Sequence, residues 1–317
     1  MTADLMLEPL ERAIGRFRGC LMGLAVGDAL GAPVEFEAPG SFQPVTSFRA
    51  GGPFKLSPGE WTDDTSLALC LAESLTTCKG FDPSDQMLHY LSWLREGHLS
   101  VNGRCFDVGS TTLSALERFE RTAEPFAGST DPESAGNGSL MRLAPVPMAY
   151  FREPEEAIHM AGESSRTTHG ARQCVDACRF YAGLIVGALR GASKEELLAS
   201  MFSPVPGLWE REPLCDSVAN VAKGSFKEKE PPAIRGGGHV IESFEAALWA
   251  FHKGSDFREG ALLAVNLGSD ADTTGAIFGQ LAGAYYRLRG IPEEWTQRLA
   301  KREVILGFAD RLYKVFS

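Results

Sequence analysis

Two short clusters of oxygen-bearing side chains, one near each end of the chain, are the clearest chemical feature of the sequence. The first reads Thr62-Asp63-Asp64-Thr65 and the second reads Asp270-Ala271-Asp272-Thr273. Each comes directly before an apolar run with helical spacing, and neither has a Lys or Arg within several residues to neutralise it. Carboxylate and hydroxyl oxygens are hard ligands, so the cation they suit is Mg²⁺, Mn²⁺ or Ca²⁺ rather than a transition metal bound by thiolate or imidazole.

These clusters have two interpretations, which can coexist. Thr and Asp are preferred N-cap residues, and acids in a first turn are favoured by the positive end of the helix dipole, so each cluster could simply begin a helix. Four carboxylates can instead bind one ion, or two ions bridged by a shared carboxylate, and two-metal sites usually catalyse hydrolysis. The recurrence of like chemistry at both ends of one chain favours the metal site.

Composition limits the class of protein. The chain has 317 residues with 44% hydrophobic content, which is enough for a substantial core and allows one large domain or two small ones. The net charge of -10 argues against a nucleic-acid partner or an anionic membrane surface, because both attract basic proteins. A substrate that carries phosphate would need bound metal to offset this negative field.

The sequence also predicts a cytoplasmic protein with reduced cysteines. The amino-terminal segment mixes acids and bases before any apolar stretch, unlike a secretory signal, and no apolar run is long enough to span a bilayer. The seven cysteines form no CxxC pair and no zinc-like pairing with His. Cys174 and Cys178 stand at helical spacing, which is typical of buried structural thiols.

Helical periodicity recurs along almost the whole chain, whereas strand signals are weak. Only residues 45–54 could form a short extended segment, and residues 223–232 read as a surface loop. We therefore predict one all-α domain over residues 1–317. The expected helices span residues 12–27, 65–78, 83–96, 109–121, 155–166, 170–190, 193–202, 240–252, 256–266, 274–289 and 303–315.

Two stripes of glycine predict where helices approach most closely. Glycines recur every four residues from Gly19 to Gly31 and again from Gly275 to Gly283. Each glycine inside a helix costs roughly 0.5–1 kcal/mol relative to Ala, so such a stripe is usually kept for close backbone approach. We predict that these two helices pack against central neighbours, which could be each other.

Five blocks of sequence, in this order, resemble the ADP-ribosylglycohydrolases: GCLMGLAVGDALGAPVEFE, WTDDTSLALCLAESL, SAGNGSLMRLAPVP, SSRTTHG and NLGSDADTTGAIFGQLAGAYY. The resemblance implies an orthogonal multi-helix bundle around a binuclear metal site with two divalent cations, Mg²⁺ or Mn²⁺. It implies hydrolysis of the bond between C1″ of the distal ribose of ADP-ribose and a side-chain nitrogen or oxygen. The implied metal ligands are Thr62, Asp63, Asp64, Asp270, Asp272 and Thr273, of which Asp63 is also expected to serve catalysis.

The resemblance also implies roles for two further acids. Glu35 matches a glutamate beside the metals that carries a proton or acts as a gate, although it could be a solvated loop residue and Glu37 is a near neighbour. Asp107 matches an aspartate that binds substrate and orients the departing guanidinium in arginine-directed members. Its alternative is an N-cap for the helix expected near Gly109.

A turn-rich segment and a histidine complete the expected site. By the resemblance, the segment contacts ADP-ribose through Gly136, Asn137, Gly138, Ser139 and Met141, and its exposed amides suit a diphosphate. His169 is expected to donate to a phosphate or ribose oxygen unless it caps the following helix. We expect Arg142 to form a buried ion pair, and His89, His98, His159 and His252 to be surface or helix residues.

One position departs from the family pattern. Many bacterial members carry an aromatic residue that could stack on the substrate where this chain has His239, which stacks less extensively and can titrate near neutral pH. The first functional prediction is cleavage of ADP-ribosylated arginine on a protein or small molecule. The alternatives are an O-linked substrate such as ADP-ribosyl-serine, a metal-dependent phosphohydrolase, and a non-catalytic ADP-ribose-binding protein. The acceptor, the choice between Mg²⁺ and Mn²⁺, the stereochemical outcome and the oligomeric state stay open.

Overall fold

The regular secondary structure of the described residues is helical, apart from isolated β-bridges, which confirms the all-α prediction. The computed structural model describes residues 3–317, with side chains from residue 11 onward, so the first two residues of the expected domain lie outside it. The α-helices are α1 (Ala3–Gly31), α2 (Asp63–Cys78), α3 (Pro83–Glu96), α4 (Ser110–Thr122), α5 (Pro145–Ala149), α6 (Pro154–Arg166), α7 (Arg172–Leu189), α8 (Lys194–Leu197), α9 (Leu208–Arg211), α10 (Asp216–Ala222), α11 (Val240–Lys253), α12 (Phe257–Val265), α13 (Ala271–Tyr286), α14 (Glu293–Arg298) and α15 (Arg302–Phe316). The 3₁₀ helices are η1 (Ala32–Val34), η2 (Pro132–Ser134), η3 (Ser225–Glu228) and η4 (Leu288–Gly290).

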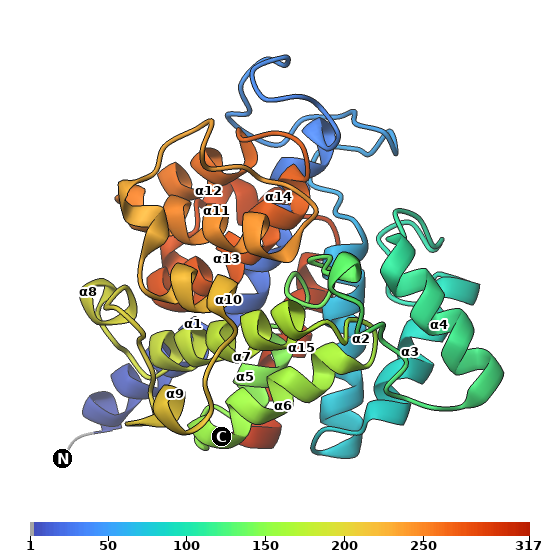
Figure 1. The fold of residues 1–317 in the computed structure, drawn as a ribbon. Coiled ribbons are helices and arrows are strands. Elements are labelled where there is room, and N and C mark those ends of the chain that lie inside the picture. The colour runs from blue at the N-terminus through green and yellow to red at the C-terminus, as the bar shows by residue number, and fades with distance from the viewer. Residues whose placement is uncertain (1–2) are drawn as a thin grey trace.

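Helices α1 and α13 form the centre of the molecule and pack against each other through their glycine stripes (Figure 1). A Cβ atom added at Gly23 would lie 2.2 Å from the carbonyl oxygen of Gly279, and one at Gly279 would lie 1.9 Å from that of Gly23. Only glycine allows this approach, so the predicted close packing is confirmed. The pairing brings the two ends of the sequence together.

The other helices surround this pair. In Figure 1, α2, α3 and α4 lie on one side of the molecule, and α10, α11 and α12 lie on the side of α13. Capping explains the sharp bounds of α3, because the Asp82 carboxylate accepts hydrogen bonds from two amides of the first turn and Gly97 ends the helix in the left-handed conformation. One hydrophobic cluster runs through most of the helices.

Several expected elements differ in the structure. Residues 193–202 form only the single turn of α8, and α13 ends at Tyr286 because Arg287 has a φ of 67°. Residues 45–54 form no strand and contribute only an isolated bridge between Gly51 and Leu56. The predicted loop 223–232 contains η3, and the short helices α5, α9, α10 and α14 were not expected.

The sequence predicted reduced, structural cysteines and no membrane-spanning helix. All seven thiols are free, and Cys20, Cys70, Cys174 and Cys178 are buried, which raises their pKa values. No helix in the described part of the chain is both long and apolar enough to cross a membrane.

Candidate active site

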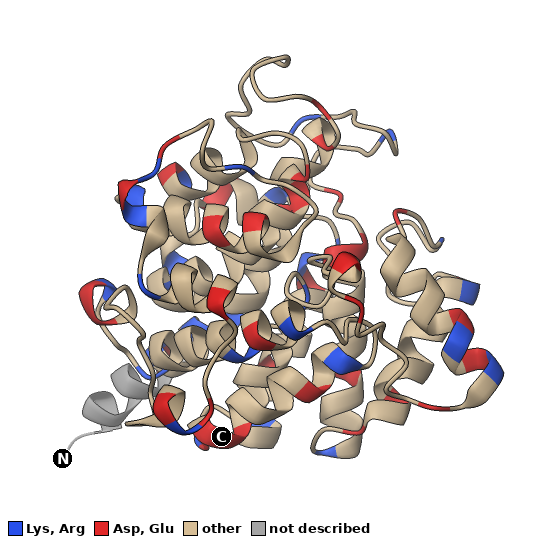
Figure 2. Ribbon diagram, viewed as in Figure 1, with Lys and Arg blue, Asp and Glu red and all other residues tan. Residues whose placement is uncertain are grey.

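The two acidic clusters meet at the amino-terminal ends of α2 and α13. Thr62 is the N-cap residue of α2 and Asp270 is that of α13, yet neither side chain forms a capping hydrogen bond. Figure 2 shows acidic residues at this end of α2. Capping alone therefore does not explain the clusters, because these side chains turn away from their own helix amides toward each other.

The Thr62 hydroxyl lies among three carboxylates. Its oxygen is 3.0 Å from Oδ1 of Asp28, 3.2 Å from Oδ2 of Asp64 and 3.3 Å from Oδ2 of Asp272. A hydroxyl has one hydrogen, so it can donate to only one of these oxygens. The other carboxylates gain no hydrogen bond from it, so each needs a proton or a cation as its partner.

Three buried oxygens around this point have no hydrogen-bond partner: Oδ1 of Asp64, Oδ1 of Asp272 and Oε2 of Glu35. Asp64 and Asp272 are each 1% exposed, and Glu35 is 5% exposed. Unpaired buried charge is strongly unfavourable, and carboxylates in such a setting usually coordinate a metal or become protonated. The donor set is made only of carboxylate and hydroxyl oxygens, so these residues fit a hard divalent cation.

The carboxyl groups of this centre hold their protons tightly in the absence of a cation. Burial raises the pKa values of Asp63, Asp64 and Asp272 well above the ordinary range, and repulsion from neighbouring carboxylates adds to the effect. Burial also raises the pKa of Asp28 to about 6, against the opposing hydrogen bonds from Thr62 and Thr65. A bound cation would favour the ionised forms instead.

Glu35 and Asp107 approach the same centre from two loops. One oxygen each of Glu35, Asp107 and Asp272 lie within 4.8 Å of one another. Burial, followed by repulsion from Asp107, raises the pKa of Glu35 to about 9, and burial raises that of Asp107 to about 8. Both nonfunctional alternatives are wrong, because Glu35 is buried whereas Glu37 is exposed, and Gly109 rather than Asp107 is the N-cap residue of α4.

A cavity of about 240 Å³ opens onto these acids. No Lys or Arg is among its lining residues within the described part of the chain. Phe36, 69% exposed, lies at its edge directly after Glu35. The residues lining the cavity are Glu35, Phe36, Asp63, Asp107, Gly109, Ser110, Thr111, Thr112, Gly136, Asn137, Gly138, Met141, His169, Gly238, Asp270, Asp272 and Thr273.

The predicted turn-rich segment forms one wall of this cavity and is tied to the second acidic cluster. The Asn137 side-chain amide donates to Oδ2 of Asp270 at 2.7 Å, and its backbone amide donates to the Gly238 carbonyl at 3.2 Å. Gly136 and Gly138 lie against the His169 ring, where a Cβ added at Gly138 would be 2.9 Å from Cε1. The glycines therefore allow the histidine to lie directly behind this wall.

His169 is buried and neutral. Burial, followed by the nearby Arg142 charge, lowers its pKa to about 3. Thr168 Oγ1 accepts from Arg142 and lies 2.8 Å from Nδ1 of His169, so we assign its own hydrogen to that nitrogen. This assignment leaves an N–H at Nε2, on the side of Gly136. His169 does not cap α7, whose N-cap residue is Ala171.

Arg142 holds this arrangement together without an ion pair. The residue is 1% exposed, and its guanidinium donates at 2.6 Å to the Gly138 carbonyl and to Thr168 and lies over the Tyr90 ring. The prediction of a buried ion pair is wrong, because Arg142 forms no ion pair with a carboxylate among the described residues. Arg142 instead positions the glycine-rich wall and the histidine through neutral acceptors.

Ser139 and His239, which the sequence analysis placed at or near the substrate, do not line the cavity. Ser139 does not line the cavity, because its hydroxyl lies 2.8 Å from that of Ser165 in the interior. His239, where the family pattern often has an aromatic residue, caps α11 by accepting at Nδ1 from the Ile241 amide. Neither residue therefore lines the cavity, and His239 does not replace the aromatic residue of the family pattern there.

Sequence reasoning missed Asp28, which organises the first cluster. This fully buried carboxylate accepts from the amide and hydroxyl of both Thr62 and Thr65, at 2.6–3.1 Å. An acid within the apolar run from Leu24 to Leu30 was the available signal. The edge residue Phe36 and the polar start of α4, Ser110 to Thr112, were not predicted from the sequence either.

Comparison with known proteins places this geometry in context. The model of the ADP-ribosylglycohydrolase family matches residues 9–317. The chain is 40% identical to ADP-ribosylarginine hydrolase Tri1 of Pseudomonas putida (strain GB-1), over 96% of this chain and 79% of the relative. It is 37% identical to the protein of the same name in Serratia proteamaculans (strain 568), over 97% and 81%. A solved structure titled "ADP-ribosylglycohydrolase-related protein complex" superposes with a TM-score of 0.85 at 46% identity, over 97% of this chain and all of the other.

Proposed function

Because the chain belongs to the ADP-ribosylglycohydrolase family, and is thus a metal-dependent hydrolase of ADP-ribose glycosidic bonds, we propose that its substrate is ADP-ribosylated arginine on a protein or small molecule. We further propose two divalent cations, Mg²⁺ or Mn²⁺, as its cofactors. Their ligands would be Thr62, Asp63, Asp64, Asp270, Asp272 and Thr273.

The observation that supports this proposal best is the meeting of the two acidic clusters at one cavity. Asp63 of the first cluster and Asp272 of the second both line this cavity, and Asp64 and Asp272 each have a buried oxygen without a hydrogen-bond partner. Bound cations would supply Lewis acidity for the attack of water on C1″ and for holding the distal ribose. The α1–α13 pairing supports this site. Asp28 on α1 accepts hydrogen bonds from Thr62 and Thr65 of the first cluster, and α13 begins at the second cluster.

Hydrolysis breaks the bond between C1″ and a guanidine nitrogen and forms one between C1″ and a water oxygen. A proton must leave the water, and one must reach the departing guanidine. Glu35 is suited to carrying a proton, because it lines the cavity and its Oε2 has no competing partner. His169 can donate its Nε2–H to a substrate oxygen while staying neutral.

Preference for arginine is supported by Asp107. This acid lines the cavity next to Glu35, is only half-buried, and is held at a backbone φ of 62°. An anionic oxygen at this position would attract and orient a planar, cationic guanidinium. A serine acceptor is neutral and offers no such interaction. The names of the two bacterial relatives agree with this preference.

The proposal is tested by release of free ADP-ribose from ADP-ribosyl-arginine. The purified protein is assayed with Mg²⁺, with Mn²⁺ and with a chelator, beside an Asp272→Ala variant. We expect metal-dependent release that the variant loses by at least about 100-fold, the typical size of a lost electrostatic contribution to catalysis. Thermal unfolding in chelator provides the control, because Asp272 has one unpartnered buried oxygen and only a 3.3 Å contact with Thr62, so its removal should not destabilise the metal-free protein.

The products separate this function from its alternatives. Release from serine-linked but not arginine-linked ADP-ribose would assign an O-linked substrate and contradict the role of Asp107. Inorganic phosphate or AMP would identify a phosphohydrolase. Binding of ADP-ribose without turnover of either substrate would identify a binding protein.

A further inference from the structure

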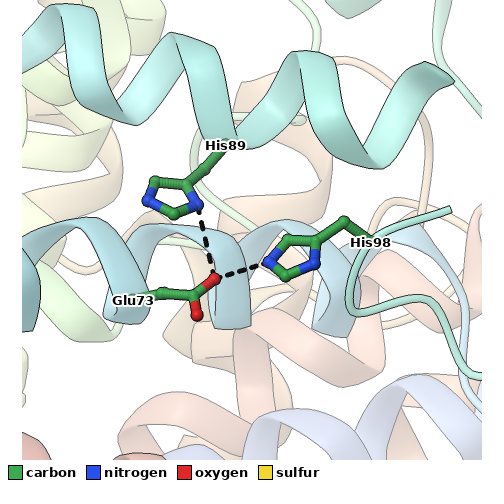
Figure 3. Close-up of side chains that lie close together, drawn as sticks. All are labelled: Glu73, His89 and His98. Carbon is green, nitrogen blue, oxygen red and sulfur yellow. Dashed lines mark hydrogen bonds and ion pairs between the residues drawn. The ribbon is translucent and has the colours of Figure 1, made fainter. Parts of the chain in front are cut away.

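A second group of metal-ligating side chains lies outside the active-site cavity. Glu73 is on α2, His89 is on α3 and His98 follows the end of α3, and Figure 3 shows both imidazoles directed at one carboxylate oxygen of Glu73. This oxygen is 3.3 Å from Nδ1 of His89 and 2.5 Å from Nε2 of His98. The three side chains are 22–35% exposed, so an ion can reach them from solvent.

The surroundings of this cluster are negative. Asp85 lies one helical turn before His89, and its Oδ2 is 3.4 Å from Nε2 of that histidine. This Oδ2 is buried and has no hydrogen bond of good geometry. Within the described residues, neither Glu73 nor Asp85 forms an ion pair with a Lys or Arg. Two carboxylates thus share two histidines and lack a permanent cation.

We propose that Glu73, His89 and His98 bind a divalent transition-metal ion of the Zn²⁺ class, at a site separate from the hard-ligand centre. Imidazole nitrogen with carboxylate oxygen is a ligand set that Zn²⁺ accepts and that Mg²⁺ does not favour. Three protein ligands leave a fourth position for water.

Asp85 gives His89 the orientation that such a ligand needs. A metal-bound histidine usually donates its other ring N–H to a carboxylate, which fixes the tautomer. Asp85 Oδ2 lies 3.4 Å from Nε2, so in the metal-bound form it would hold the proton on that nitrogen and leave the lone pair of Nδ1 for the ion. The two imidazole rings are stacked with their centroids 6.0 Å apart, so both can direct a nitrogen at the same ion.

The ligand atoms lie within 4.8 Å of one another, so the tetrahedral spacing requires only small movements. Zn²⁺ bonds of 2.0–2.2 Å in a tetrahedron place ligand atoms about 3.4 Å apart. The 3.3 Å between Glu73 and His89 already fits, whereas His98 must retreat by roughly 0.9 Å from its hydrogen bond with Glu73. His98 lies in the loop after α3, where this movement needs no change of helix packing, and the displaced Nε2 proton leaves to Nδ1 or solvent.

The bound ion would join α2, α3 and the first residues of the segment that leads from Gly97 to Asp107. We therefore expect Zn²⁺ to raise the thermal midpoint of protein already saturated with Mg²⁺. Saturation matters because the active-site acids could otherwise take up the added ion. Cys78 is exposed on the end of α2, so the experiment uses a Cys78→Ser background to remove its thiol.

The test is a calorimetric titration with Zn²⁺ of this Mg²⁺-saturated background and of a His89→Gln/His98→Gln double variant. We expect the background to bind one more equivalent than the double variant, and Co²⁺ to give a visible d–d spectrum that the double variant lacks. Asp85→Asn removes no ligand, and it should weaken Zn²⁺ binding by about 10–100-fold, as loss of such a supporting carboxylate typically does.

A matched control carries His159→Gln and His252→Gln, which remove two histidines outside the cluster and should leave Zn²⁺ binding unchanged. Equal stoichiometry and affinity in the background and the His89/His98 variant would overturn the proposal and assign any binding to other sites. If the double variant does not fold, Glu73→Gln gives the same decision, because it replaces the anionic carboxylate with a neutral amide, a much weaker metal ligand, and leaves both histidines.

Discussion

At the scale of single residues, the feature that most affects function is a carboxylate with no partner. Glu35 is buried at the cavity, its Oε2 makes no hydrogen bond, and burial with the Asp107 charge raises its pKa to about 9. A Glu35→Gln variant keeps the shape but cannot carry a proton. We expect turnover to fall by about 10²–10⁴-fold, the usual contribution of general acid–base catalysis, with metal content unchanged.

Steady-state release of ADP-ribose, together with metal analysis of the same samples, checks this prediction. A variant that binds metal normally and keeps near-normal turnover would remove Glu35 from the mechanism. Glu37→Gln is the matched control, since Glu37 is two residues away and exposed, and it should leave the rate within about 2-fold, as for a typical surface substitution.

Asp107 supports a prediction about substrate choice. Asp107→Ala should reduce cleavage of ADP-ribosyl-arginine by at least about 10-fold, because the departing guanidinium loses an anionic partner worth more than about 1.4 kcal/mol. Binding of free ADP-ribose, measured by calorimetry, should change much less. Equal losses in both measurements would show that Asp107 acts on the ADP-ribose moiety rather than on the acceptor.

The structure brings together the acids that the sequence singled out, but the sequence did not indicate what holds them. Asp63, Asp64 and Asp272 stand in polar clusters at helix starts, where the residue types themselves indicate a ligand role. Asp28 lies in an apolar helix, and its four hydrogen bonds exist only once α2 is docked. Arg142 was expected to pair with a carboxylate, yet it is held by a carbonyl, a hydroxyl and a ring. Such tertiary contacts have no local signature.

At the scale of helices, the α1–α13 contact positions the site, because α1 carries Asp28 and α13 carries Asp272. Gly23→Ala would place a methyl group 2.2 Å from the Gly279 carbonyl oxygen and force the two backbones apart. We expect a loss of at least about 1–3 kcal/mol in the free energy of unfolding, the usual range for overpacking, together with weaker metal binding.

A second glycine of α1 provides the matched control. A Cβ at Gly15 would meet nothing closer than 3.8 Å, so Gly15→Ala should stabilise the protein by about 0.5–1 kcal/mol. Denaturant titration of both variants measures the difference. An unchanged stability of Gly23→Ala would mean that the helices separate without cost and would contradict the central role of this contact.

Long helices were predicted from periodicity, whereas the short ones were not. Helices α2, α3 and α6 agree with expectation to within two residues, because each contains several turns of one apolar pattern. Helix α9 spans four residues, which is too short for a period of 3.6 residues to be recognised, whereas the helix expected over residues 193–202 is reduced to the four residues of α8. The end of α13 depends on a positive φ at Arg287, a residue type that does not indicate one.

At the scale of the whole molecule, folding gathers like charge at one point. The net charge is -10, and the described cavity is lined by Glu35, Asp63, Asp107, Asp270 and Asp272 without a basic residue. Figure 2 shows Lys and Arg spread over many helices and loops rather than gathered in one place. The described hydrophobic cluster supplies the stability that offsets this repulsion, and it agrees with the single domain over residues 1–317, which stays a prediction.

This charge makes stability depend on pH when metal is absent. The pKa values of Glu35 and Asp107 are about 9 and 8 in the folded state, against about 4 for unfolded carboxyl groups. The folded state therefore binds more protons between these limits, so its extra stability is complete below about pH 4 and is lost as the pH rises to about 9. In chelator, the free energy of unfolding should fall by on the order of 2 kcal/mol or more between about pH 6 and 9.

Bound Mg²⁺ or Mn²⁺ should remove most of this pH dependence, because the cation replaces the protons as the partner of the carboxylates. Urea titrations at about pH 6 and 9, each with metal and with chelator, measure four free energies of unfolding from which the metal effect at each pH is obtained. The metal effect should be larger at the higher pH, and Glu35→Gln should reduce the pH dependence in chelator. If metal stabilised the protein equally at both values, the buried acids would not be protonated in the metal-free protein, and their repulsion would have to be relieved by some other cation.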